Sequence, residues 1–149
     1  MSNPEVQVRF LQSYDSQEAA AIGALMPNLY AEDKGEPLPE DLFREIVESP
    51  DREQLVAEAH GRIVGSAILH YMVVGRDRKV YLDDFVCEAS MQGRGVGYAM
   101  WQEIERYAAN RGAAKIEWIS RYDREKAHDF YHRQGATISE TAFFKKYIN

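Results

Sequence analysis

The chain lacks the features that would tie it to a disulfide framework, a membrane or a nucleic acid. It has one cysteine, Cys87, which can form no internal disulfide, so a reducing cytoplasm is the expected location. No apolar run approaches the roughly 20 residues of a membrane span, and no signal-peptide pattern opens the chain. A net charge of −6 argues against nucleic acid and favours cationic ligands. We therefore expect neither a membrane nor a nucleic acid among the partners.

Proline is confined to the first part of the chain, and repeats and linkers are absent. All five prolines lie at or before position 50. The 149 residues, 45% hydrophobic and 28% charged, match an ordinary globular protein. We expect a single domain over residues 1–149.

Two common phosphate-binding motifs are absent, but a third glycine-rich turn is present. The dinucleotide pattern Gly-x-Gly-x-x-Gly fails because its third glycine would fall on Tyr98 or Met100. No Gly-Lys-Ser/Thr triplet of a P-loop occurs. Residues 92–97 instead read Gln-Gly-Arg-Gly-Val-Gly, between a strand-like run at 80–87 and an apolar stripe at Val96, Met100, Ile104 and Ala108. A glycine-rich turn that opens a helix can direct backbone N–H groups at a phosphate.

The hydrophobic patterns predict a mixed sheet flanked by helices. Strands are expected at 6–11, 54–59, 63–74, 79–87, 114–120 and 141–148, and helices at 16–29 (capped by Ser16), 40–48, 96–112 and 125–134. The order is β-α-α-β-β-β-α-β-α-β. The three central strands should pair antiparallel, and the helix from Val96 should bring the next strand back parallel. The fold class is α/β (α+β), with a mostly antiparallel sheet.

Three motifs resemble the GNAT superfamily of acyl-CoA-dependent N-acetyltransferases. Gln92, Gly95 and Gly97 match its pyrophosphate signature Gln/Arg-x-x-Gly-x-Gly. Residues 127–136 resemble its late helix, Ala-x-x-Phe-Tyr-x-x-x-Gly. With Tyr-Leu-Asp-Asp-Phe at 81–85, the motifs are most similar to the diamine/polyamine acetyltransferase branch. The predicted element order is also that of the superfamily.

The resemblance implies roles for individual residues. Tyr131 matches the tyrosine that protonates the CoA sulfur, and Asp83 and Asp84 match an acidic pair that serves the amine. Because adjacent strand residues face opposite sides, only one of the pair should face a given cleft, with Asp83 preferred. Arg124 stands where relatives often have a CoA-contacting asparagine, and it can meet a phosphate instead. The implied acetyl-CoA-binding residues are Phe85, Val86, Cys87, Gln92, Gly93, Arg94, Gly95, Val96, Gly97, Tyr98 and Arg124.

The implied reaction is acetyl transfer from acetyl-CoA to a primary amine, on a small polyamine-like or amino-acid-like molecule. The alternatives are a protein lysine or N-terminal acetyltransferase, a catalytically silent acyl-CoA sensor, and an interaction domain that binds no CoA. No metal is expected: His128 and His132 are spaced i, i+4 but lack the metalloprotease glutamate and a third ligand.

Two further expectations concern surfaces. In relatives the N-terminal region, here with Tyr14, Tyr30 and Phe43, shapes the acceptor pocket, and these aromatic residues are equally expected to pack in the core. GNAT relatives are frequently homodimers, and Phe143 and Phe144 are candidate interface residues, with a monomer as the alternative.

Overall fold

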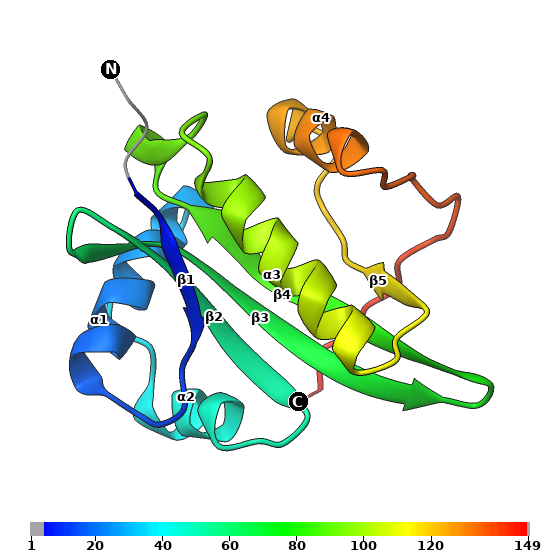
Figure 1. The fold of residues 1–149 in the computed structure, drawn as a ribbon, viewed down its shortest axis with the longest axis horizontal. Helices are drawn as coiled ribbons and strands as arrows, with labels where there is room; N and C mark the ends of the chain where they lie inside the picture. The colour runs from blue at the N-terminus through cyan, green and yellow to red at the C-terminus, as the bar shows by residue number, and fades with distance from the viewer. Residues whose placement is uncertain (1–4, 149) are drawn as a thin grey trace. The chain divides into compact units, whose positions relative to one another are not determined.

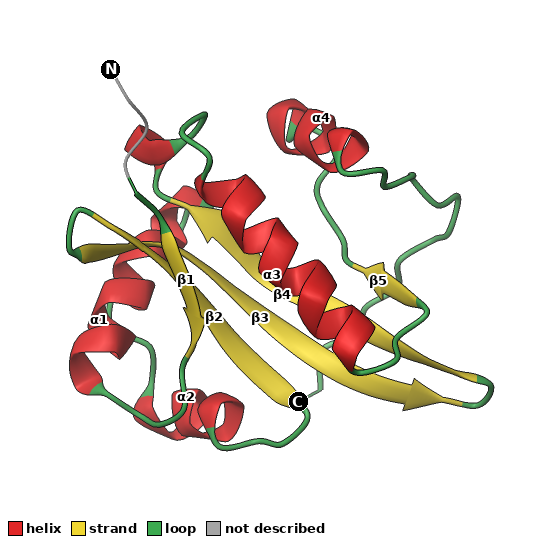
Figure 2. Cartoon of the chain, viewed as in Figure 1, coloured by secondary structure: helices red, strands yellow, loops and turns green. Residues whose placement is uncertain are grey.

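The computed structural model describes residues 5–148 and consists of two compact units, Met1–Trp118 and Ile119–Asn149, each described by itself. The first unit holds one sheet and its covering helices (Figures 1 and 2). Its elements are β1 (Gln7–Phe10), α1 (Ser16–Leu25), the 3-10 turn η1 (Met26–Asn28), α2 (Glu40–Val47), β2 (Arg52–Ala59), β3 (Arg62–Val74), β4 (Asp77–Cys87), the 3-10 turn η2 (Ala89–Met91), α3 (Val96–Asn110) and β5 (Lys115–Glu117).

The sheet follows the chain order β1-β2-β3-β4-β5. Pairing is antiparallel from β1 to β4, whereas β4 and β5 are parallel because α3 crosses over between them. Helix α3 covers one face, and α1 and α2 cover the other (Figure 1). The predicted mixed, mostly antiparallel sheet with flanking helices is confirmed.

The core on the α3 side follows the predicted stripe. Val96, Met100, Ile104 and Ala108 are all buried, and burial of such side chains stabilises the fold by about 1.5–3 kcal/mol for each of the larger ones. A Cβ built on Gly65 would lie 2.7 Å from the Met100 sulfur, so the close approach of α3 to β3 depends on that glycine. This packing fixes the start of α3 beside the end of β4.

The opposite face has its own core, formed where α1 and α2 meet the sheet. Ile22 of α1, Phe43 of α2, Val56 of β2 and Val86 of β4 belong to one buried cluster. The cap of α1 differs from the prediction: Asp15, not Ser16, accepts the amide hydrogens of residues 17 and 18 at 2.9 Å each.

The second unit contains one regular element among its described residues, α4 (Glu125–Arg133). The predicted strand at 141–148 is wrong, because these residues form neither a strand nor a helix. A strand exists only where a neighbour pairs its backbone groups, and no strand of the described residues pairs with this segment. Its large side chains are exposed, with Phe144 at 88% and Phe143 at 65%.

No helix within residues 5–148 combines the length and the apolar character required to cross a bilayer.

Candidate functional site

A bulge in β4 shapes the centre of the site. Ser66 of β3 lies opposite Val86, and Ile68 lies opposite Asp83. One residue of β3 therefore faces two residues of β4, Asp84 and Phe85. Asp84 has φ of 48°, in the left-handed region, which is the kind of backbone conformation by which a bulge accommodates its extra residue.

The bulge brings the two neighbouring carboxylates to the same face of the sheet. Asp83 lies directly opposite Ile68, and directly opposed residues share a face. Asp84 lines the same pocket as Ile68, on the side of α1 and α2. Phe85 turns to the other face, where its ring packs against Trp101 of α3 with centroids 6.3 Å apart. The expectation that the two aspartates face opposite sides is thus wrong, because the extra residue interrupts the alternation of the strand. One of the pair does line the pocket, but it is Asp84 and not the preferred Asp83.

Asp84 is held by the segment that follows α1. Its carboxylate accepts a hydrogen bond from the hydroxyl of Tyr30. Asn28, in η1, fixes the same segment to the end of β4: its side-chain oxygen accepts the amide hydrogen of Ala89 at 3.1 Å. These contacts connect the N-terminal region to the bulge and set the position of the Asp84 carboxylate.

Asp83 and His70 form a second polar group beside Asp84. Burial raises the pKa of Asp83 above its ordinary value, and the negative charge of Asp84 raises it further. Burial lowers the pKa of His70 despite the neighbouring carboxylates. His70 Nε2 lies 3.9 Å from an Asp83 carboxylate oxygen, too far for a hydrogen bond. Because its pKa lies below the ordinary value, His70 is predominantly neutral at pH 7, and a neutral imidazole can accept a proton.

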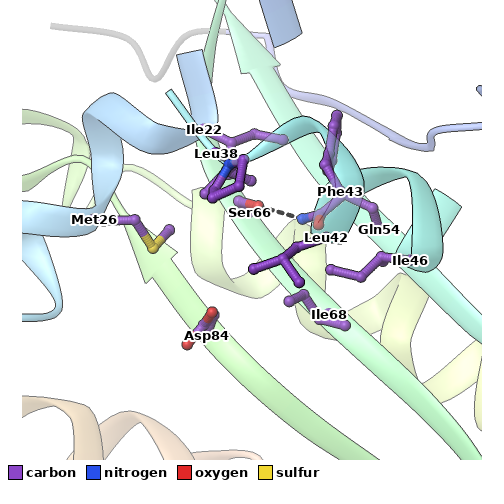
Figure 3. A pocket seen from close by; sticks show the side chains of 11 residues that line it. Ile22, Met26, Leu38, Leu42, Phe43, Ile46, Gln54, Ser66, Ile68 and Asp84 are labelled. Atoms are coloured by element: carbon purple, nitrogen blue, oxygen red, sulfur yellow. Dashed lines mark hydrogen bonds between the residues drawn. The ribbon is translucent and has the colours of Figure 1, made fainter. Parts of the chain in front are cut away.

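A pocket of about 160 Å³ opens between α1, α2 and the sheet (Figure 3). Most of its wall is apolar, and Asp84 is the charged residue that lines it. The apolar side chains include Ile22, Met26, Leu42, Phe43, Ile46 and Ile68.

The remaining polar side chains of the wall bond to each other. Gln54 and Ser66 are each 1% exposed. The Gln54 amide nitrogen donates to the Ser66 hydroxyl at 2.6 Å and to the Ala67 carbonyl at 3.2 Å, which links β2 to β3 under the pocket. Gln54 Oε1 has no hydrogen-bond partner among the described residues.

The glycine turn lies at the start of α3, as predicted. Gly93 and Gly95 have φ of 76° and 85°, a conformation that costs other residues about 1–2 kcal/mol. A Cβ on either glycine would meet nothing within 4 Å, so the turn borders open space. The first hydrogen bond of the helix runs from Ala99 to the Gly95 carbonyl at 3.0 Å. The amides of residues 96–98 therefore begin the helix without an intrahelical acceptor, as a phosphate site requires.

The end of β4 has a backbone edge beside this turn that β5 does not cover. Its pairing with β5 covers only Lys79 to Tyr81. The Glu88 amide donates to Val64 of β3 at 2.8 Å. Because backbone groups alternate in direction along a strand, those of Cys87 turn to the opposite edge, where no strand of the described residues pairs with them.

Cys87 has no properties of a nucleophile. Burial raises the pKa of its thiol to about 11, so little thiolate exists at neutral pH. Its contribution to this edge is therefore its backbone.

Tyr131 and Arg124 belong to the second unit. Tyr131 is half-buried on α4, and its ring lies 5.9 Å from that of Phe130. Arg124 is the residue immediately before α4. Of the predicted residues, the structure therefore brings together Asp83, Asp84, the Phe85–Cys87 edge and the glycine turn within the first unit.

The two histidines of α4 have protein partners. His128 Nε2 lies 3.1 Å from the Ser120 hydroxyl, and His132 Nδ1 lies 3.2 Å from the Ala136 carbonyl oxygen. Within residues 5–148 no group of three potential metal ligands occurs.

Sequence reasoning missed His70, Gln54 and Ser66. All three are polar residues inside predicted strands. A polar residue at such a position is the signal by which the sequence could have identified them. Their relation to Asp83 and Asp84 depends on strand register, which the bulge changes.

Comparisons with known proteins agree with this geometry. The model of the acetyltransferase (GNAT) family matches residues 24–136. Uncharacterized N-acetyltransferases of Mycobacterium bovis and Mycobacterium tuberculosis are each 32% identical over 104 residues, which cover 69% of this chain. The chain spans 64% of the length of these curated relatives.

Solved structures share the fold. A transcriptional regulator from Bacillus halodurans C-125 has a TM-score of 0.83 and 19% identity, over 96% of this chain and 100% of that one. An aminoglycoside acetyltransferase from an uncultured soil metagenomic sample has a TM-score of 0.83 and 18% identity, over 97% and 99% of the two chains.

Proposed function

The chain belongs to the acetyltransferase (GNAT) family, and we propose that it transfers the acetyl group of acetyl-CoA to the primary amine of a small cationic molecule. One observation carries the proposal. The bulge of β4 presents Asp83 and Asp84 on the side of an apolar pocket, while the same strand continues to the edge at Cys87 and into a glycine turn. This arrangement supports an amine site and a donor site along one strand.

The donor side has the groups that acetyl-CoA requires. The family uses acetyl-CoA as its co-substrate, and this molecule supplies a thioester, an activated acyl group. The open turn at Gly93 and Gly95 and the unbonded amides that start α3 suit its pyrophosphate. The outward backbone groups of Cys87 suit the amide groups of the pantetheine arm, which binds like an added strand in relatives.

The acceptor side has a place for the charge and for the proton. A primary amine is protonated at neutral pH, and the carboxylates of Asp84 and Asp83 attract the ammonium group. We assign removal of its proton to Asp83. Its raised pKa is closer to neutral pH than that of an ordinary carboxylate, which makes Asp83 a better base. The amine nitrogen then forms a bond to the thioester carbonyl carbon, loses its second proton to solvent, and the carbon–sulfur bond breaks. Tyr131 gives its phenolic proton to the departing thiolate, the role that the family resemblance implies for it.

The proposal is tested by release of free CoA thiol with a panel of amines. The wild-type protein should release thiol with at least one small primary amine. The Asp83→Asn variant keeps the shape of the side chain and loses its charge, so we expect kcat/KM for the amine to fall by about 10²-fold. Acetyl-CoA affinity, measured by calorimetry, should stay unchanged.

The alternative functions give different results in the same assay. Binding of acetyl-CoA without thiol release for any amine or peptide would indicate a silent acyl-CoA sensor. Thiol release only with lysine-containing or N-terminal peptides would indicate a protein acetyltransferase. Absence of thermal stabilisation by acetyl-CoA would indicate an interaction domain, since a ligand at 100 times its dissociation constant adds about 2.7 kcal/mol.

A further inference from the structure

The pocket beside Asp84 has one charged residue and an otherwise uncharged wall. Of the residues that line it, Asp84 carries the negative charge and none is basic. Gln54 and Ser66 are neutral and bonded to each other. The other lining residues are apolar and come from α1, α2, β3 and the intervening loop (Figure 3). The wall is therefore built for a ligand with a single positive charge and an apolar body.

From this chemistry we infer that the acceptor is a primary monoamine carrying one compact apolar group. The inference rests on the proposed acetyl transfer and names its substrate class. The ammonium group lies at Asp84, whose carboxylate is positioned by the Tyr30 hydroxyl. The apolar group enters the space between Leu42 of α2 and Ile68 of β3.

The volume of the pocket sets the size of that group. About 160 Å³ is available, and an apolar cavity of about 150 Å³ in a protein binds benzene. A phenyl ring or a branched chain of similar volume fits. A bulkier body would require the walls to move apart, which closely packed side chains resist.

Charge separates this acceptor from the other small amines. A polyamine carries a second ammonium group, which would enter an apolar wall without a carboxylate beside it. An amino acid carries a carboxylate, and the wall has no basic side chain to pair with it. Each of these ligands would bury one uncompensated charge, and the monoamine buries none.

The test compares three amines on the full-length protein: 2-phenylethylamine, putrescine and phenylalanine. We expect kcat/KM for 2-phenylethylamine to exceed that for each of the others by at least about tenfold. A preference for putrescine or phenylalanine would overturn the inference and leave the proposed acetyl transfer standing. If none of the three is acetylated, calorimetric binding decides: tightest binding of 2-phenylethylamine supports the inference, and equal or absent binding overturns it.

A second experiment introduces a negative charge into the wall of the pocket. Leu42 lines the pocket and is 54% exposed, so Leu42→Asp should fold. We expect this variant to reduce the ratio of 2-phenylethylamine to putrescine in kcat/KM, or in affinity, by about tenfold. The matched control is Val73→Asp, which adds the same charge at an exposed β3 position that does not line the pocket. Equal changes in both variants would contradict the assignment of the apolar group to this wall.

Discussion

The hydroxyl of Tyr30 donates a hydrogen bond to the carboxylate of Asp84, a residue 54 positions further along the chain. The bond joins the segment after α1 to the bulge of β4. It ends at a residue with φ of 48°, so it supports a backbone conformation that is uncommon outside glycine. The position of the Asp84 carboxylate therefore depends on the N-terminal region.

Removal of that hydroxyl should weaken use of the amine. In Tyr30→Phe the ring remains and Asp84 loses its donor, so the carboxylate is less firmly placed. A hydrogen bond to a charged group contributes about 1.5–3 kcal/mol. Because Tyr30 is 49% exposed, we expect the lower end, a fall in kcat/KM for the amine of about tenfold. Tyr122→Phe, at an exposed position of the second unit, is the control. Wild-type kinetics in Tyr30→Phe would show that Asp84 needs no such support.

A side chain on the glycine turn should impair donor binding. Gly95→Glu introduces a negative charge and bulk where the pyrophosphate is proposed to lie, and acetyl-CoA affinity should fall by at least about tenfold, or 1.4 kcal/mol. Gly112→Glu is a matched control, because Gly112 also has a left-handed φ, 71°, and open space around it, at the opposite end of α3. Calorimetry with acetyl-CoA distinguishes the two variants. Equal losses of affinity would point to backbone strain, and unchanged affinity in Gly95→Glu would remove the turn from the donor site.

His70 should make the folded state sensitive to mild acid. Burial lowers its pKa in the folded protein below the ordinary value of 6.5. At pH values between 6.5 and the lower pKa of the folded state, His70 is protonated in the unfolded chain but not in the folded protein. The free energy of unfolding should therefore decrease as pH falls through this range. Urea denaturation at pH 7.5 and 5.5 measures the decrease, and His70→Gln should make it smaller. His132→Gln, at an exposed position, should keep the wild-type difference. A His70→Gln variant with an undiminished difference would exclude His70 as its source.

Tyr131→Phe tests the proposed proton donor of the leaving thiolate. The change removes one oxygen and leaves the ring to pack against Phe130. If Tyr131 protonates the thiolate, kcat should fall by about 10²-fold or more, while acetyl-CoA affinity stays the same. The high-pH limb of the rate profile, which tyrosine ionisation would cause, should also disappear. Full turnover on an accepted amine would leave Tyr131 as a packing residue only.

Local sequence signals were enough for most of the elements and for the glycine turn. The stripe from Val96 to Ala108 predicted α3, because one face of an isolated helix is already visible at 3.6-residue spacing. The glycines of the turn were informative for a similar reason: a left-handed φ at Gly93 and Gly95 is a property of single residues. These features depend on neighbours within a few positions of the chain.

The surroundings of Asp83 and Asp84 were decided by contacts between distant segments. Alternation predicted Asp83 and Asp84 on opposite faces, and the bulge placed them on the same face because β3 offers one residue fewer than β4 at that point. His70 approaches Asp83, and Tyr30 reaches Asp84, only through strand register and the packing of α1. The segment at 141–148 also shows the importance of distant contacts. Its pattern suits a strand, yet it forms none, since no strand within residues 5–148 pairs with its backbone. Periodicity depends on residues that are neighbours in the sequence, whereas register, bulges and pockets depend on contacts between segments that are far apart in it.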